Sequence, residues 1–170
     1  KADSCASYSP YCIWVITIFM LLFGVNFNFY YFLFFNRIRD AFKMEEVRWY
    51  FLIVAAATGI CFLGIMGEYG TFEALTHAAF QVATIITTTG FATVDFNFWH
   101  SAAKTVLVLL MFCGACAGST GGGIKVSRIV VFFKSAVKEV GSYIHPRSVK
   151  RVKVEGKPVE HEAIRSINVY

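Results

Sequence analysis

The stretch TIITTTGFATVD, residues 84–95, decides how the fold of this chain is interpreted. It places three consecutive threonines and Gly90 between segments that are apolar enough to lie in a membrane. A second polar stretch, CGACAGSTGGGIK at 113–125, interrupts the next apolar run in the same way. Irregular backbone is tolerated at membrane depth only where protein or water surrounds it. Both stretches are therefore candidate functional sites.

The composition indicates a membrane protein. Of the 170 residues 56% are hydrophobic, and the mean hydropathy is +0.57, well above that of an ordinary soluble domain. The formal net charge of +5 would suggest nucleic-acid binding in a soluble chain. Here the basic residues occur in blocks between apolar runs, where they report orientation in the membrane. We therefore expect no nucleic-acid partner.

Three apolar runs, 11–35, 49–66 and 102–133, are long enough to cross a bilayer, which takes about 20 residues. The loop at 36–48 is rich in Arg and Lys, and a basic tail follows the third run, whereas 67–101 contains neither residue. Because positive loops stay inside, 36–48 and the tail are predicted to be cytoplasmic and 67–101 external. The basic residues of the tail are Lys134, Lys138, Arg147, Lys150, Arg151 and Lys153.

Isolated polar and sulfur side chains inside the apolar runs are interpreted as packing residues. Asn26 and Asn28 are expected to face protein. Cys113 and Cys116 form a CxxC pattern, but neither histidine nor a second cysteine pair stands at ligand spacing. We therefore expect small apolar roles for these cysteines and no metal site.

Residues 72–90 do not fit a membrane crossing. They are apolar at helical spacing, yet both of their ends lie in the segment that is predicted to be external. A short helix that enters the membrane and returns on the same side is a re-entrant loop. His77 and Gln81 are expected to brace this half-helix, with a metal site there disfavoured. Glu73 and Asp95 either enrich cations at the outer mouth or are solvated loop acids.

Residues 87–90, here called the threonine strand, follow the half-helix, so their carbonyl groups are available to line a narrow passage. Rings of carbonyl oxygens replace the hydration shell of a monovalent cation in potassium filters. Gly90 allows a backbone conformation that a Cβ atom forbids. We predict that Thr87, Thr88, Thr89 and Gly90 form a cation filter; the alternative is a polar turn at a helix end.

Residues 114–123, here called the glycine loop, should interrupt the third apolar run. Each of its glycines costs about 1 kcal/mol relative to alanine inside a helix. A non-helical segment at this depth must line a cavity or be buried in protein, so we expect it to face the pore below the filter. The alternative is close helix packing through Gly114 and Gly118. The predicted gate residues are Gly114, Gly118, Ser119, Thr120, Gly121, Gly122 and Gly123.

A nucleotide-binding loop is disfavoured at the same place. Gly118 and Gly123 have the spacing of a Walker A motif, but Ile124 separates Gly123 from Lys125, and Val126 follows the lysine. An intramembrane protease is disfavoured as well, because no His, Asp or Glu falls inside a predicted spanning segment. We expect no catalytic residue, no cofactor and no enzymatic activity.

The sequence TTTGF followed by CAGSTGGGIKVSRI resembles TrkH-type members of the Trk/Ktr/HKT superfamily of potassium transporters. The stretches IHPRSV and GKPV resemble the linker between repeats of that group. The resemblance implies an all-α membrane protein with transmembrane helices, a re-entrant pore helix and a filter loop, in the helix, pore loop, helix repeats of a potassium-channel-like architecture. It also implies a multi-pass protein of the inner (cytoplasmic) membrane that takes up K⁺.

Carried over by position, the resemblance makes residues 1–48 the last helix of the second repeat with a cytoplasmic loop. Residues 49–134 become the third repeat, and 135–170 the cytoplasmic linker and the start of the fourth. The threonine strand would supply one of four filter segments, and the glycine loop would be the intramembrane gate. Lys125 and Arg128 would cap carbonyls of the broken helix or tune cation occupancy.

The resemblance also implies partners. These are the lipid membrane, the remaining repeats of a longer chain, a second copy in a homodimer, and a cytosolic nucleotide-binding regulatory subunit that is TrkA-like. The basic tail would contact either that subunit or anionic lipid. The rival function is a noncatalytic membrane assembly subunit whose glycines serve helix packing.

Overall fold

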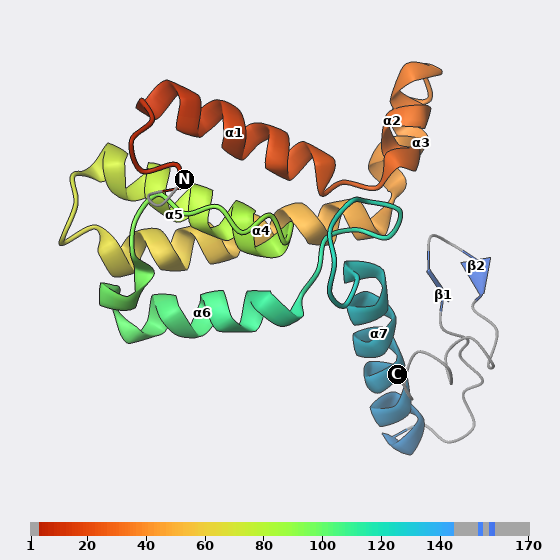
Figure 1. Cartoon of the computed structure of the whole chain (residues 1–170). Helices are drawn as coiled ribbons and strands as arrows, with labels where there is room; N and C mark the ends of the chain where they lie inside the picture. The colour runs from red at the N-terminus through yellow and green to blue at the C-terminus, as the bar shows by residue number, and fades with distance from the viewer. Residues whose placement is uncertain (1–3, 145–152, 155–156, 159–170) are drawn as a thin grey trace.

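The computed structural model describes residues 4–144, 153–154 and 157–158 (Figure 1). The described chain is helical apart from one antiparallel pair of two-residue strands. The elements are α1 (Pro10–Phe23), α2 (Phe27–Phe34), α3 (Ile38–Lys43), α4 (Glu45–Ile65), α5 (Thr71–Ile86), the 3₁₀ helix η1 (Phe96–Phe98), α6 (Ser101–Phe112), α7 (Val126–Ile144), β1 (Lys153–Val154) and β2 (Lys157–Pro158). The predicted all-α fold is confirmed. Most of IHPRSV, half of GKPV and most of the basic tail lie outside the described residues.

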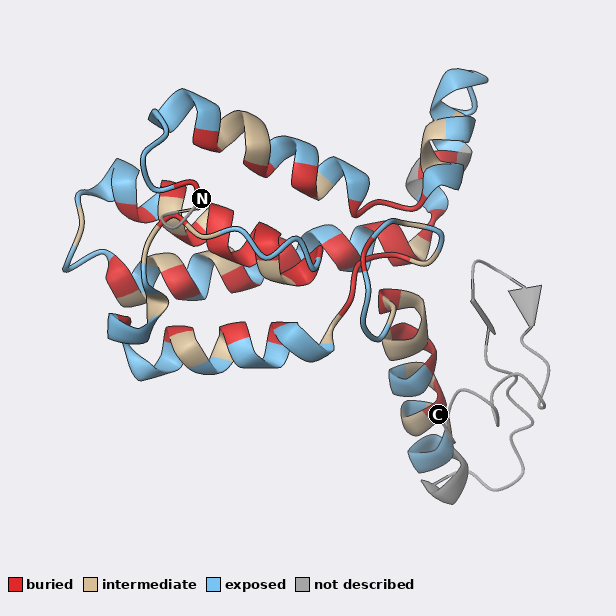
Figure 2. Ribbon diagram, in the orientation of Figure 1, coloured by how far each residue is buried: buried red, intermediate tan, exposed pale blue. Residues whose placement is uncertain are grey.

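Helix α5 forms the centre of the bundle and packs against α1, α4 and α6 (Figure 1). Its buried positions include Ala74, Ala78 and Phe80, and small residues at such positions allow neighbouring helices to approach closely. In Figure 2 the buried parts of α1, α4 and α6 face α5, and exposed residues cover their outer sides. The candidate half-helix is therefore held on three sides by helices of the same chain.

The structure confirms the re-entrant path predicted for 72–90: the chain enters the bundle as a helix and then turns back. Helix α5 starts at one end of the bundle, and residues 87–95 run back from its far end to the end where α6 starts (Figure 1). His77 braces this return, because its Nδ1 lies 3.0 Å from Oγ1 of Thr93. Gln81 is buried, but its Oε1 has no hydrogen-bond partner among the described residues, so only His77 shows the expected bracing contact.

The first apolar run is not one continuous span, and this part of the prediction is wrong. Helices α1 and α2 meet at 91°. Asn26 lies at the break and starts the second helix. Its side chain caps α2 by accepting a hydrogen bond from the amide of Asn28 at 2.9 Å. Asn26 is buried as expected, whereas Asn28 is exposed.

The third apolar run is broken as predicted, between α6 and α7. Helix α6 has 12 residues, a length of about 18 Å, which is too short to cross about 30 Å of hydrocarbon alone. Helix α7 extends to Ile144, so Lys134 and Lys138 lie on a helix and not in a tail. Among the described helices, only α4 is long and apolar enough to span a membrane by itself; α1 and α2 meet the criterion together.

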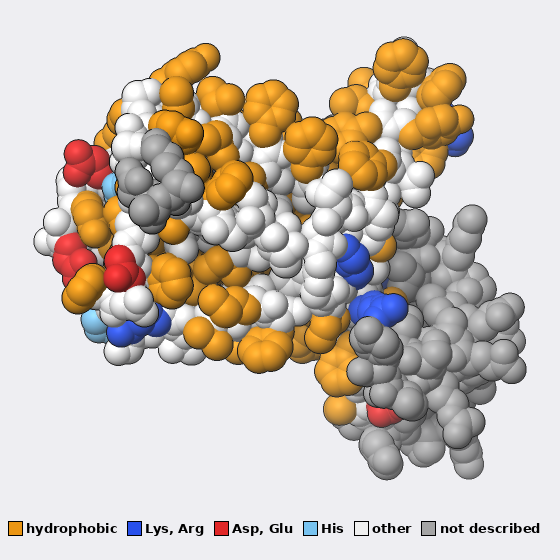
Figure 3. Space-filling view, in the orientation of Figure 1, with side chains coloured by type: hydrophobic (Ala, Val, Ile, Leu, Met, Phe, Trp, Pro, Cys, Tyr) orange, Lys and Arg blue, Asp and Glu red, His pale blue; other side chains and the backbone are white. Residues whose placement is uncertain are grey.

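The surface carries many exposed apolar side chains on the outer sides of α1, α4 and α6, among them Phe19, Leu63 and Leu109. Contiguous apolar surface of this kind indicates contact with lipid or with other protein segments. Figure 3 shows most of the visible acidic side chains gathered at the end of the bundle where α4 connects to α5. The start of α4 and the start of α7 lie at the opposite end (Figure 1), in agreement with the predicted topology.

Candidate functional site

The threonine strand begins where α5 ends. Thr87 is the C-cap residue that follows the last helical residue, Ile86, and its hydroxyl donates to the carbonyl oxygen of Ala83 at 2.7 Å. Thr88 has a φ angle of +55° and Gly90 one of +82°. A positive φ is uncommon for a β-branched residue, and such strain persists only where the surroundings hold it in place. The chain therefore turns sharply out of the helix within these residues.

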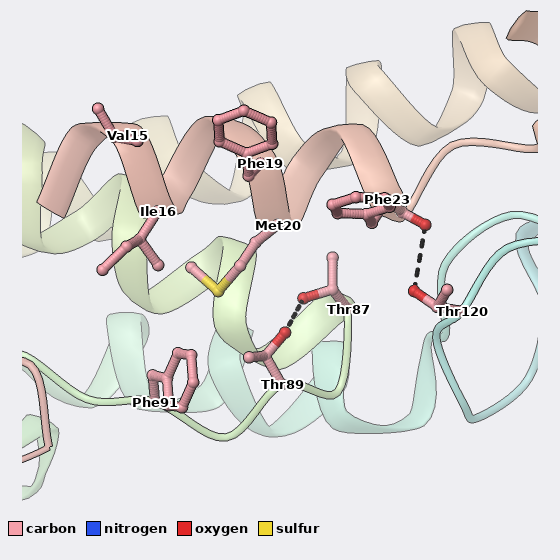
Figure 4. Close-up of a pocket in the computed structure, with 9 residues that line it drawn as sticks. All are labelled: Val15, Ile16, Phe19, Met20, Phe23, Thr87, Thr89, Phe91 and Thr120. Atoms are coloured by element: carbon pink, nitrogen blue, oxygen red, sulfur yellow. Dashed lines mark hydrogen bonds between the residues drawn. The ribbon is translucent and has the colours of Figure 1, made fainter. Parts of the chain in front are cut away.

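Figure 4 shows the side chains of Thr87 and Thr89 beside α1, where they line a cavity of about 540 Å³ together with residues of that helix. The hydroxyl groups of Thr87 and Thr89 are hydrogen-bonded to each other at 2.8 Å. Thr120 of the glycine loop lies on the same cavity wall. Residues from the two predicted motifs thus line one space, together with apolar side chains of α1 such as Met20.

The glycine loop is closed at its base by backbone hydrogen bonds between its two ends. The amide of Gly114 donates to the carbonyl oxygen of Ile124 at 2.7 Å, and the amide of Val126 donates to that of Ala115 at 3.3 Å. Cys113 and Ile124 form a parallel bridge. The chain leaves α6 and enters α7 at neighbouring points, so the loop protrudes as a compact unit between two helices.

The loop is docked on the C-terminal end of α1. The last carbonyl groups of a helix lack partners within the helix and must find donors elsewhere. The glycine loop supplies donors to two of these carbonyl groups, those of Phe23 and Gly24. The pairs are Tyr50 Oη to Leu21 O at 3.1 Å, Tyr30 Oη to Leu22 O at 2.6 Å, Thr120 Oγ1 to Phe23 O at 3.3 Å, and Cys116 N to Gly24 O at 3.0 Å. The loop thereby helps to stabilise the break between α1 and α2.

The threonine strand and the glycine loop are in direct contact. The amide of Gly122 donates to Oγ1 of Thr88 at 2.9 Å. Gly121 is buried, and a Cβ atom added to it would lie 3.5 Å from the carbonyl oxygen of Thr87. Two segments that are 34 positions apart in the sequence therefore form one site.

The two charged residues that follow the loop lie close to it. The Lys125 ammonium group donates to the carbonyl oxygen of Gly121, which belongs to the loop and not to the broken helix whose carbonyl groups it was predicted to cap. Arg128 lies half-buried in the first turn of α7. Whether either residue tunes cation occupancy stays a prediction.

Glu46 belongs to the site, and the sequence analysis missed it. It was assigned to the cytoplasmic loop at 36–48, but the structure places it in the first turn of α4, where it is 8% exposed. Its Oε1 accepts hydrogen bonds from the amides of Ala117 and Ser127, and its Oε2 accepts one from Nδ2 of Asn26. A sequence signal existed, because an acid just before an apolar run favours a helix N-terminus.

Other predicted residues have local roles. Asp95 caps η1 by accepting from the amide of Asn97 at 2.9 Å, in agreement with the loop-acid interpretation. Cys116 is buried and Cys113 half-buried, both without a disulfide. Gly114 and Gly118 lie outside every described helix, so they do not form the small-residue helix contact that was the alternative for this segment.

Comparisons with known proteins give the family. Residues 1–168 match the model of the TrkH family, described as "Cation transport protein". The "Trk system potassium uptake protein TrkH" of Halomonas elongata is 39% identical over 121 residues, which cover 70% of this chain and 25% of that protein. The TrkH of Vibrio parahaemolyticus is 30% identical over 167 residues, which cover 94% and 34%.

A solved structure agrees with these relatives. The crystal structure of the potassium transporter TrkH from Vibrio parahaemolyticus superposes with a TM-score of 0.88 at 28% identity, covering 98% of this chain and 37% of that one. The chain thus spans a quarter to a third of the length of the curated relatives above. The chain belongs to the TrkH family of cation transport proteins.

Proposed function

We propose that this chain forms one pore-lining part of a multi-pass transporter that takes up K⁺ across the inner (cytoplasmic) membrane. Family membership makes it part of a membrane protein, and the relatives from Halomonas elongata and Vibrio parahaemolyticus are potassium uptake proteins by name. The re-entrant course of α5 and residues 87–95 supports the same function, because a helix that ends inside the bundle can present carbonyl groups to an ion.

The contact between Thr88 and Gly122 carries the proposal. The threonine strand acts as the filter segment, and its backbone oxygens replace part of the water around K⁺. The glycine loop acts as a gate immediately beside it. Because the loop is held by hydrogen bonds and not by a continuous helix, it can move aside without unfolding α6 or α7.

The protein moves an ion and makes or breaks no covalent bond. It is therefore not an enzyme in this proposal, and K⁺ is its cargo and not a cofactor. The partners are the lipid bilayer, the remaining repeats of the full-length protein, a second copy in a homodimer, and a cytosolic TrkA-like subunit that acts at the end of the bundle carrying α7.

Potassium uptake by the full-length protein in cells that lack their own K⁺ uptake systems tests the proposal. Growth at low K⁺, together with uptake of ⁸⁶Rb⁺ by these cells, is the expected result. Normal membrane abundance without uptake would reject it and would favour the noncatalytic assembly subunit.

A further inference from the structure

Glu46 is the one carboxylate among the described residues that is both buried and bonded to the glycine loop. It lies at the second position of α4, at the end of the bundle where α7 begins (Figure 1). An ionised carboxylate is costly to bury unless donors surround it. The donors around Glu46 therefore identify the elements that it holds together.

Three donors reach this carboxylate from three separate segments. The amide of Ala117, in the glycine loop, donates to Oε1 at 2.5 Å, and the amide of Ser127, in the first turn of α7, donates to the same oxygen at 3.1 Å. Nδ2 of Asn26, at the break between α1 and α2, donates to Oε2 at 3.3 Å. Hydrogen bonds to a charged acceptor are roughly twice as strong as neutral ones.

We propose that Glu46 is a positioning residue that latches the glycine loop against the threonine strand and ties that position to α7. Because one oxygen serves both amides, a displacement of α7 away from α4 weakens the hold on Ala117 as well. The loop then loses one of its anchors, the hydrogen bond from the amide of Ala117.

Asn26 extends the latch to the first break. Its Oδ1 caps α2 while its Nδ2 bonds Glu46, so the side chain is fixed at both ends. The amide of Phe27 also donates to the carbonyl oxygen of Gly118 at 3.2 Å. Helices α2, α4 and α7 thus act together with α1 to determine the position of the glycine loop. This inference rests on the proposed function of the loop as a gate.

The test uses the full-length protein, purified and reconstituted in liposomes without any partner. Glu46→Ala removes the acceptor, and Glu46→Gln keeps its size and one acceptor oxygen but removes the charge. Glu68→Gln is the control, because it makes the same charge change at an exposed residue just past the C-terminal end of α4, away from the start of α7. We expect K⁺ flux to rise about tenfold in E46A and about threefold in E46Q, from the loss of charge-assisted hydrogen bonds. Flux in E68Q should stay within about twofold of wild type.

A spin label at Ser119→Cys, in a cysteine-free background, measures the mobility of the loop independently of transport. Mobility should increase in E46A and E46Q and stay unchanged in E68Q. Unchanged mobility in both Glu46 variants, or an equal increase in E68Q, would overturn the latch. If removal of residues 117–121 raises flux while both Glu46 variants behave as wild type, the latch is wrong and the gate remains. If the label loosens but no variant conducts K⁺, the latch holds and the proposed transport function fails.

Discussion

A Cβ atom on Gly114 would lie 1.9 Å from the carbonyl oxygen of Gly122. Both groups belong to the backbone, so no side chain can rotate away to make room. Gly122 takes part in both contacts, because its amide donates to Oγ1 of Thr88 while its carbonyl oxygen lies against Gly114. Gly114 is therefore required by the close approach of two backbone segments.

Gly114→Ala should displace the loop and raise K⁺ flux through the reconstituted full-length protein severalfold. The alanine methyl group forces Gly122 away from Gly114, and this movement breaks the hydrogen bond to Thr88. Gly59→Ala is the control, because a Cβ atom on Gly59, within α4, meets nothing within 4 Å. Wild-type flux in G114A at normal abundance would show that the loop position does not limit transport.

Thr88→Val should loosen the loop without changing the shape of the side chain. Valine fills the same volume but cannot accept the hydrogen bond from Gly122, and one such bond is worth about 1 kcal/mol, or about fivefold in the loop equilibrium. Thr105→Val is the control, because the Thr105 hydroxyl donates its hydrogen bond within its own helix, to the carbonyl oxygen of Ser101. Equal fluxes in T88V and T105V would contradict the coupling between the two segments.

The sequence predicted the features that depend on local chemistry. Glycine density in 114–123 opposes a helix, and the structure has none there. The absence of basic residues in 67–101 predicted that both ends of the half-helix lie on one side. The break at Asn26 was missed because the run 11–35 is uncharged throughout, and hydropathy alone does not register a capping asparagine two residues after Gly24.

Glu46 was missed for a different reason. Two of its hydrogen-bond donors, the amides of Ala117 and Ser127, are 71 and 81 positions away in the sequence. Its burial therefore depends on how α4, α7 and the glycine loop come together. An acid at the start of an apolar run has the same sequence context whether it is solvated or buried. Tertiary contacts of this kind are visible only in the folded chain.

Gly90→Ser should lower the preference for K⁺ over Na⁺ more than it lowers abundance. Gly90 has a φ angle of +82°, which costs a residue with a Cβ atom about 1–2 kcal/mol, but nothing lies within 4 Å of the added atom. The strain changes the backbone that presents the carbonyl groups without creating a clash. Paired K⁺ and Na⁺ uptake assays measure the ratio, with Gly67→Ala, another open position, as control. An unchanged ratio in G90S would remove Gly90 from the filter.

Single cysteines at Asn97 and Arg39 should be labelled from opposite sides of the membrane. Both positions are exposed, and they lie in the segments that the basic-residue pattern assigns to the outside and to the cytoplasm. In a cysteine-free background, a membrane-impermeant maleimide added to intact cells should modify Asn97→Cys alone. Modification of both cysteines under these conditions would contradict the prediction that the two segments lie on opposite sides of the membrane.

The central claim is that the glycine loop is a movable gate beside the threonine strand. Deleting residues 117–121 tests it most directly, because the hydrogen bonds between Gly114 and Ile124 and between Ala115 and Val126 keep the ends of α6 and α7 together without those five residues. K⁺ flux through the purified, reconstituted full-length protein should rise, with assembly largely intact and control by any regulatory partner weakened. Normal assembly with unchanged or lower flux would contradict the gate.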